Sequence, residues 1–351
     1  DSQKYRENKD EFRELIYFLT KILKNYHRTP IFIHKMKEIL LHIIDDIKQV
    51  FSNKEIFGLF KGNKLILLFL IQNKVITIDE QLSKIITQDH FHYYFYPEIK
   101  PFLDEELTRE IEKKLTEKYS NFMEHFEEKR QEGENDSTIC QIIRNDSIDE
   151  FIIFLNEPNS THLNSKIENS IFETNSFLLV ESPTLIEYAA FCGSIQIFNY
   201  LILNQAKINE KLWLYAIHGR NTEIIAKLDE EIFTNLSEKN YKSYFKEAVK
   251  CHHNEIAYYF KDKLNIEEEE EEEIEGDNQT YYLDFYSNIL NCSFQYHNYE
   301  FFPKKFNSKY ILYLLVKLNY FNLVKLLFKA KGDKLQNILN LRFTVFVVFN
   351  L

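Results

Sequence analysis

The sequence predicts an all-α fold, in which helical hairpins stack as a solenoid that follows an N-terminal helical region. Three observations predict it. The stretch Thr184–Leu228 contains two helical hairpins in tandem, the same apolar pattern returns elsewhere in the chain, and the 351 residues include only 7 Gly and 6 Pro. Few chain-breaking residues favour helix. A hairpin with one apolar face is too small to form a core alone, so it needs neighbours of its own kind.

The two hairpins of Thr184–Leu228 share one arrangement of residues. In the first, Ala189 and Ala190 give a short helix a small face for close packing, and Gly193 can adopt the positive φ that ends this helix. Apolar residues then continue at helical spacing on a second helix. In the second hairpin, Ala216 falls on the position of Ala189. The two segments are therefore predicted to be repeats of one unit.

The hairpin pattern recurs where Ile142, Ala248 and Leu315 occupy the position of Ala189. Residues 156–182 connect the hairpin of Ile142 to that of Ala189, and this connection is longer than adjacent repeats need. Because it holds several apolar residues, we expect an ordered excursion that packs down and not a free loop.

These residues resemble the ankyrin repeat, whose helix pair reads T-P-L-H-x-A-A-x-x-G-x-x-x-I-V-x-x-L-L. The matching positions hold Thr184, Ile186, Ala189, Ala190, Gly193, Ile197, Phe198 and Leu201. Leu185 and Glu187 stand where the repeat has its proline and histidine. The stretch is also similar to the large family of divergent ankyrin-repeat proteins of trichomonad protozoa. The resemblance implies an ankyrin-type stack without a catalytic motif.

The pattern divides the chain into three parts. A polar break at residues 133–136 follows an N-terminal helical region, and eight glutamates between residues 267 and 275 repel one another, which predicts a disordered insertion. The last residues, FTVFVVFNL, are uncharged, β-branched and aromatic. The predicted parts are the helical region 1–132, degenerate ankyrin repeats over 136–340 with the acidic insertion near 266–278, and an atypical apolar tail over 341–351.

Within residues 1–132 the apolar spacing predicts separate helices. We expect a helical hairpin or a three-helix start over residues 11–51, a buried helix over Asn63–Gln72, and a further helix from Glu80. Asp104–Arg130 is dense in Glu and Lys at helical spacing, which predicts one long, largely solvated helix.

Charge and cysteine usage exclude several classes of protein. The net charge is −11, and no cluster of Lys and Arg is present to neutralise a nucleic acid. The longest apolar run, Leu65–Ile71, is too short to span a bilayer. The 4 cysteines include no C-x-x-C pair and follow no secretory signal, so we predict reduced thiols in an intracellular, cytoplasmic protein.

No chemical motif is found in the sequence. The chain holds no G-x-S-x-G, phosphate loop, G-x-G-x-x-G or H-E-x-x-H. The close histidine pairs, His90 with His92 and His252 with His253, lack further ligands at metal-site spacing. We therefore predict no catalytic, cofactor-binding or metal-binding residues.

The predicted function is that of a non-enzymatic scaffold or adaptor, which binds an unknown protein partner in the concave face of the repeats. The residues expected to be exposed on that face are Glu187, Tyr188, Lys211, Leu214, Tyr215, Lys246 and Glu247. Two alternatives stay open. The chain is a truncated family copy without retained function, or it is an enzyme with an unrecognised site in residues 1–130.

Overall fold

The protein is all-α. A computed structural model describes residues 9–25, 30–89, 91–118, 125–157, 162–233, 236–264, 289–302, 309–318, 320, 323 and 324. These residues form helices and no strand; one isolated bridge joins Lys166 to Thr184. The chain divides into two compact units, Asp1–Asn25 with Tyr241–Leu351 as unit 1 and Tyr26–Asn240 as unit 2.

The first half of unit 2 is a series of short helices. They are α3 (Pro30–His42), α4 (Ile44–Val50), α5 (Asn53–Phe60), α6 (Lys64–Gln72), α7 (Glu80–Gln88), α8 (Tyr96–Ile99), η1 (Lys100–Phe102), α9 (Glu105–Lys118) and α10 (Phe126–Glu132). The predicted helices α6 and α7 are both present. Asn63 and Asp79 cap them, because their side chains accept hydrogen bonds from the backbone of the first turn at 3.1 and 2.8 Å. Most of α6 is buried, as predicted.

The prediction of one long solvated helix over Asp104–Arg130 is wrong. α9 ends at Lys118, and α10 begins only after His125, whose φ of +62° lies in the left-handed region and cannot continue a helix. Arg130 is also buried and ion-paired, not solvated. The Glu- and Lys-rich composition predicts neither the helix break at His125 nor the burial of Arg130.

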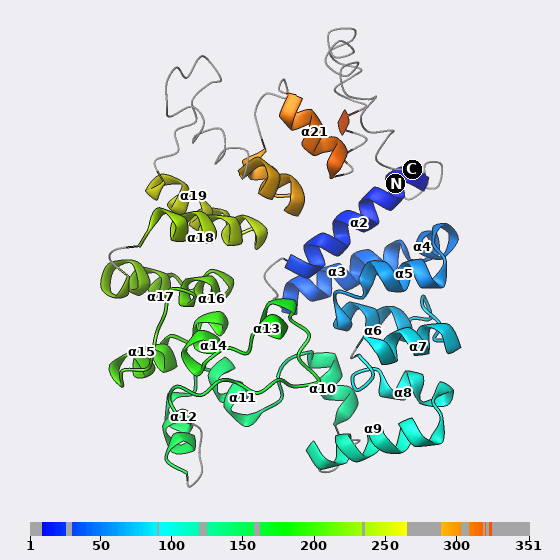
Figure 1. The fold of residues 1–351 in the computed structure, drawn as a ribbon, viewed down its shortest axis with the longest axis horizontal. Coiled ribbons are helices and arrows are strands. Elements are labelled where there is room, and N and C mark those ends of the chain that lie inside the picture. The colour runs from blue at the N-terminus through cyan, green and yellow to red at the C-terminus, as the bar shows by residue number, and fades with distance from the viewer. Residues whose placement is uncertain are drawn as a thin grey trace. The chain divides into compact units, whose positions relative to one another are not determined.

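The second half of unit 2 contains three helical hairpins in two rows. One row holds α11 (Thr138–Arg144), α14 (Leu185–Cys192) and α16 (Leu212–Gly219); the other holds α12 (Ile148–Leu155), α15 (Ile195–Leu203) and α17 (Thr222–Lys227), which η2 (Leu228–Ile232) extends. α14 packs against α11 and α16, and α15 packs against α12 and α17 (Figure 1). The hairpins of Ala189 and Ala216 are therefore in contact, as their shared pattern predicts.

Replacing Ala189 with leucine should lower the free energy of unfolding by about 1–3 kcal/mol, because the larger side chain overpacks the contact between first helices. Ala189 and Ala216 are both fully buried, so Ala216→Leu should behave alike. Thermal or urea unfolding measures the change. Unchanged stability in both variants would contradict close packing at this position.

The connection between the first two hairpins is ordered in its described part. Residues 162–182 include α13 (Ser176–Val180), and Ile167 and Phe172 are buried, which confirms the expected packed excursion. The excursion is also hydrogen-bonded to the polar break at residues 133–136. Thr174 N donates to Gly133 O at 3.0 Å, and Thr174 Oγ1 donates to the same oxygen at 2.7 Å. The domain boundary at this break stays a prediction.

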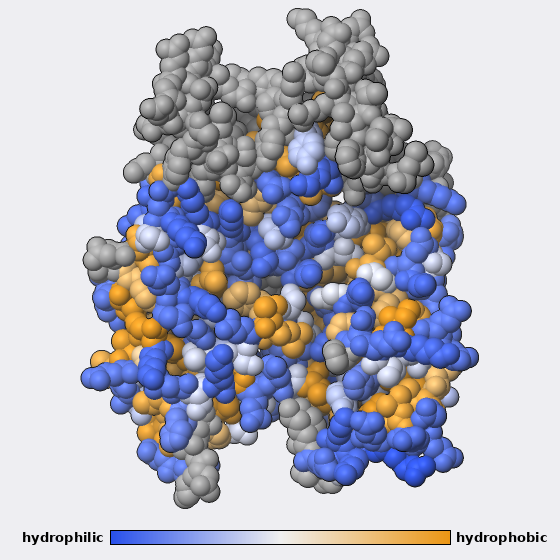
Figure 2. Space-filling model, in the orientation of Figure 1, coloured by the Kyte–Doolittle hydropathy of each residue, from blue (hydrophilic) through white to orange (hydrophobic). Residues whose placement is uncertain are grey.

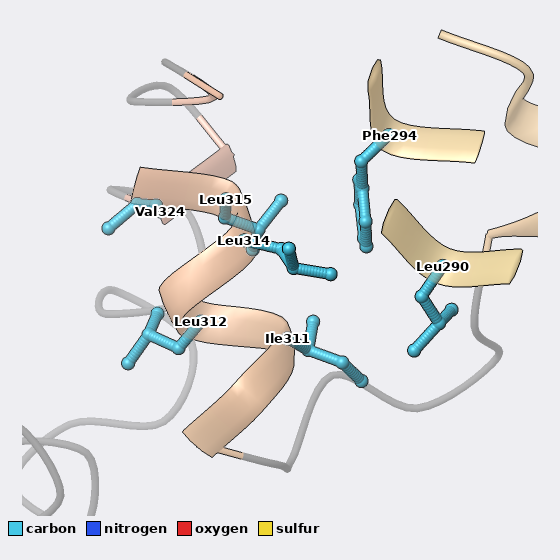
Figure 3. Packing of buried hydrophobic residues seen from close by; sticks show 7 residues of the cluster. All are labelled: Leu290, Phe294, Ile311, Leu312, Leu314, Leu315 and Val324. Atoms are coloured by element: carbon cyan, nitrogen blue, oxygen red, sulfur yellow. The ribbon is translucent and has the colours of Figure 1, made fainter. Parts of the chain in front are cut away.

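Unit 1 is helical too. Its described elements are α2 (Lys9–Asn25), most of α18 (Glu238–Lys250), α19 (Asn254–Lys263), the helix of residues 289–296, η3 (Tyr299–Phe301) and α21 (Lys309–Lys317). A buried apolar cluster joins α21 to the helix of residues 289–296 (Figure 3). Its members are Leu290, Phe294, Ile311, Leu312, Leu314, Leu315 and Val324. The predicted acidic insertion and apolar tail lie outside the described residues.

Candidate functional site

Turns that follow the first helices share one backbone conformation in the described part of the chain. Five residues take a φ between +51° and +75° at the end of the first helix, namely Asp146, Gly193, Arg220, His252 and His297. Gly193 adopts this conformation without the steric cost of a Cβ, as predicted. His297 ends the helix of residues 289–296 in the same conformation. The sequence pattern did not predict a first helix of a hairpin there.

Polar side chains join the turn of one hairpin to the next. In unit 2, Asp146 accepts hydrogen bonds from the backbone N–H groups of Gln196 and Ile197 at 3.0 Å and so caps α15. Asn221 Nδ2 donates to Gly193 O at 2.9 Å, one hairpin further along. These bonds satisfy backbone groups of one hairpin with side chains of its neighbour. The residues at the turns are therefore structural.

Glu187 was predicted to be exposed on the partner-binding face, and this is wrong. It is buried and forms a capping box with Thr184: its Oε2 accepts from Thr184 N at 2.8 Å, and its own N–H donates to Thr184 Oγ1 at 3.4 Å. The carboxylate therefore caps the first turn of α14.

Tyr188 was also predicted to be exposed, but it is only 2% exposed. Its hydroxyl accepts a hydrogen bond from Arg144 Nη1 at 2.8 Å, and Arg144 Nε pairs with Glu134 at 2.7 Å. Burial raises the pKa of the Tyr188 hydroxyl, so it stays protonated. An arginine from the preceding hairpin, which no local pattern predicts, thus fixes this side chain in the interior.

Tyr215 is the third predicted face residue that is buried, at 5% exposure. The Phe177 ring from α13 lies 5.0 Å from the Tyr215 ring and stacks on His218 at 4.0 Å. The Phe191 ring stacks on the rings of Phe177 and His218, at 6.0 and 5.6 Å between centroids. The excursion therefore covers the first helices with an aromatic side chain, where the sequence predicted an open surface for a partner.

Two predicted face residues stay accessible in unit 2. Lys211 is exposed and Leu214 is half-buried. Lys211 Nζ pairs with Glu181 Oε2 at 2.8 Å, directly after α13. The two residues before Glu181 are the exposed apolar side chains of α13, with Leu179 at 37% and Val180 at 86% exposure. We call Leu179, Val180, Lys211 and Leu214 the α13 patch.

Leu179 and Val180 were not predicted as surface residues, although the sequence holds a signal for them. Asn175 accepts a hydrogen bond from Phe177 N at 3.0 Å and begins a short helix. An N-capping residue before the apolar run Phe177–Val180, inside a connection already expected to pack, predicts a docked helix with an unmatched apolar end.

A second apolar surface lies on the row of second helices in unit 2. Ile153 of α12 and Leu203 of α15 are 65% and 81% exposed. Figure 2 shows hydrophobic residues gathered over α12, α15 and α17. Apolar side chains grouped in this way on a protein surface are typical of contact sites.

The remaining predicted face residues, Lys246 and Glu247, belong to unit 1. Lys246 is exposed, whereas Glu247 is half-buried and pairs with Lys250 Nζ at 2.9 Å. Both line a cavity in that unit together with Lys250.

The four cysteines, Cys140, Cys192, Cys251 and Cys292, are free thiols. Burial raises the pKa of Cys140 to about 11 and that of Cys292 to about 12. Both are protonated at neutral pH, which makes them poor nucleophiles.

Among the described residues, every helix is too short or too polar to cross a membrane. Comparison of the chain with protein-family models, with curated proteins and with solved structures gave no match.

Proposed function

We propose that the chain is a non-enzymatic protein–protein interaction scaffold or adaptor, built on degenerate ankyrin-type hairpins that stack as a solenoid. The observation that supports it most is the pair of helix rows in unit 2, with α11, α14 and α16 in one row and α12, α15 and α17 in the other. Stacked hairpins of this kind present helix faces and loops to partners. The free thiols fit a reducing, cytoplasmic location.

The polar residues of the hairpins also support a scaffold. Glu187 caps α14, Asp146 caps α15, and Asn221 joins two turns. These three polar side chains therefore hold the stack together. The surface that remains for a partner therefore consists of the side chains outside this network.

The α13 patch is the surface that we assign to the partner. Phe177 anchors α13 on the first helices, and the Glu181–Lys211 pair lies beside its end, so Leu179 and Val180 are presented on a fixed helix. Apolar side chains held in place bind with a smaller loss of conformational entropy than mobile ones do. The excursion thus replaces the open concave face with a smaller surface of its own.

Replacing Leu179 and Val180 together with serine should abolish partner capture while the protein stays folded. Both side chains are exposed, so we expect a change in unfolding free energy within about 0.5 kcal/mol. Tagged wild-type and variant proteins are compared by affinity capture from the source cell with mass spectrometry, and circular dichroism checks the fold.

The matched control is the double substitution Ile153→Ser with Leu203→Ser, which removes two exposed apolar residues from the row of second helices. Capture should persist in this control. If capture is lost only in the control, the second helices form the binding surface. If purified protein turns over a substrate in a broad hydrolase and transferase screen, the scaffold proposal itself fails.

A further inference from the structure

A cavity of about 190 Å³ lies in unit 1 between α18 and the helix of residues 289–296. Its polar lining comes from both helices, with Lys246, Glu247 and Lys250 on the first and Asn291, Gln295 and Tyr296 on the second. Residues four apart share one face of a helix. This spacing places the two lysines on one wall of the cavity and the two amides on the other.

The two walls are held together by contacts next to the cavity. Cys292 Sγ lies 3.6 Å from Lys246 O, and Asn298 Nδ2 donates to Val249 O at 2.9 Å. These contacts join the helix of residues 289–296 to α18 at two levels. The cavity is therefore a built feature of unit 1.

The lining of the cavity includes a lysine without a described ion-pair partner. Lys250 Nζ pairs with Glu247 Oε1 at 2.9 Å, whereas the Lys246 ammonium makes no ion pair with another described residue. Burial lowers the pKa of Lys250, Glu247 raises it, and the net change is upward, so this lysine stays charged. Burial keeps the Cys292 thiol neutral by raising its pKa to about 12. Lys246 is thus the cation of the lining that no described carboxylate neutralises.

The other polar side chains of the lining can donate hydrogen bonds. The side chains of Asn291, Gln295 and Tyr296 make no hydrogen bond to another described residue. Burial raises the pKa of the Tyr296 hydroxyl, so it remains a donor. A ligand that accepts hydrogen bonds in several directions and carries negative charge would satisfy these groups together with Lys246.

We propose that this cavity binds a phosphate group, either as inorganic phosphate or as the phosphate of a monoester. The tetrahedral oxygens can accept from donors on both walls, and lysine holds phosphate as a point charge. The volume is below the roughly 300–1,000 Å³ of sites for drug-sized ligands, which limits the ligand to a small group. The site does not depend on the scaffold proposal, because all its residues lie in unit 1.

Isothermal titration of the full chain tests the site, with inorganic phosphate and O-phosphoserine as ligands and serine as the blank. Saturable binding of at least one phosphate ligand is expected, with none for serine. Tighter binding of O-phosphoserine assigns the site to monoesters, and tighter binding of inorganic phosphate assigns it to the free ion. Absence of binding by both ligands at millimolar concentration overturns the proposal.

Three variants locate the site. Lys246→Gln should weaken phosphate binding about tenfold or more, because it removes a charged donor. Glu247→Gln should strengthen binding, since it removes the carboxylate that competes for Lys250. Lys239→Gln makes the same charge change on α18 but outside the cavity, so it should leave phosphate binding unchanged.

Circular dichroism confirms that each variant is folded. Equal effects of Lys246→Gln and Lys239→Gln would reduce the binding to general electrostatics and overturn the site.

Discussion

Replacing Arg130 with methionine should lower the free energy of unfolding by about 3–5 kcal/mol, because it removes one partner of a buried ion pair. Arg130 is 1% exposed. Its Nη1 and Nη2 donate to the Glu98 carboxylate at 2.8 and 3.0 Å, and Nη1 also donates to Tyr94 O at 3.0 Å. Methionine makes none of these bonds and leaves Glu98 without its cation. Urea unfolding followed by circular dichroism measures the change.

The matched control for Arg130 is Arg109→Met on α9. Arg109 is exposed, and among the described residues it pairs only with the exposed Glu105, so we expect a change within about 0.5 kcal/mol. Adding Glu98→Gln to Arg130→Met should cost less than the sum of the two single changes, because it removes the carboxylate left unpaired. A loss below about 1 kcal/mol for Arg130→Met would show that the pair is not a stabilising contact.

Local features of this chain could be predicted from the sequence. Asn63 and Asp79 are capping residues directly before apolar runs, and Gly193 follows a short helix with a small apolar face. Each signal lies within a few residues of the structure that it specifies. The helices α6 and α7, the hairpins and the packing of Ala189 follow from such signals.

The candidate surface could not be predicted in the same way, because it depends on contacts between distant residues. Phe177 covers Tyr215, and Arg144 reaches Tyr188 from the preceding hairpin. Helical spacing marks both tyrosines as lying on the first helices but does not show what packs on them. The excursion was expected to pack, but its docking position, and with it the burial of Glu187, Tyr188 and Tyr215, required the structure.

The helix break between α9 and α10 could not be predicted from the sequence either. His125 takes a left-handed conformation between two stretches that both have helical spacing, and Arg130 enters the interior only because Glu98 and Tyr94 receive it. Glu and Lys at helical spacing are typical of a solvated helix, so composition alone favours the wrong structure here. Arg130 also pairs with the exposed Glu127 on its own helix, but Glu98 and Tyr94, which receive it in the interior, lie more than thirty residues away in the sequence.

Replacing Gly219 with alanine should lower the free energy of unfolding by about 3 kcal/mol, at the upper end of the cost of overpacking. A Cβ on Gly219 would lie 2.0 Å from Ala190 O and 3.1 Å from Phe191 O, so α14 and α16 would have to separate. Both obstacles are backbone atoms, which cannot move aside as a flexible side chain can.

The control is Gly58→Ala in α5, where nothing lies within 4 Å of the added Cβ. There the same change should stabilise the protein by about 0.5–1 kcal/mol, since alanine favours helix. Urea unfolding of the two variants should therefore give shifts of opposite sign, and a neutral Gly219→Ala would mean that the first helices do not approach each other at this glycine.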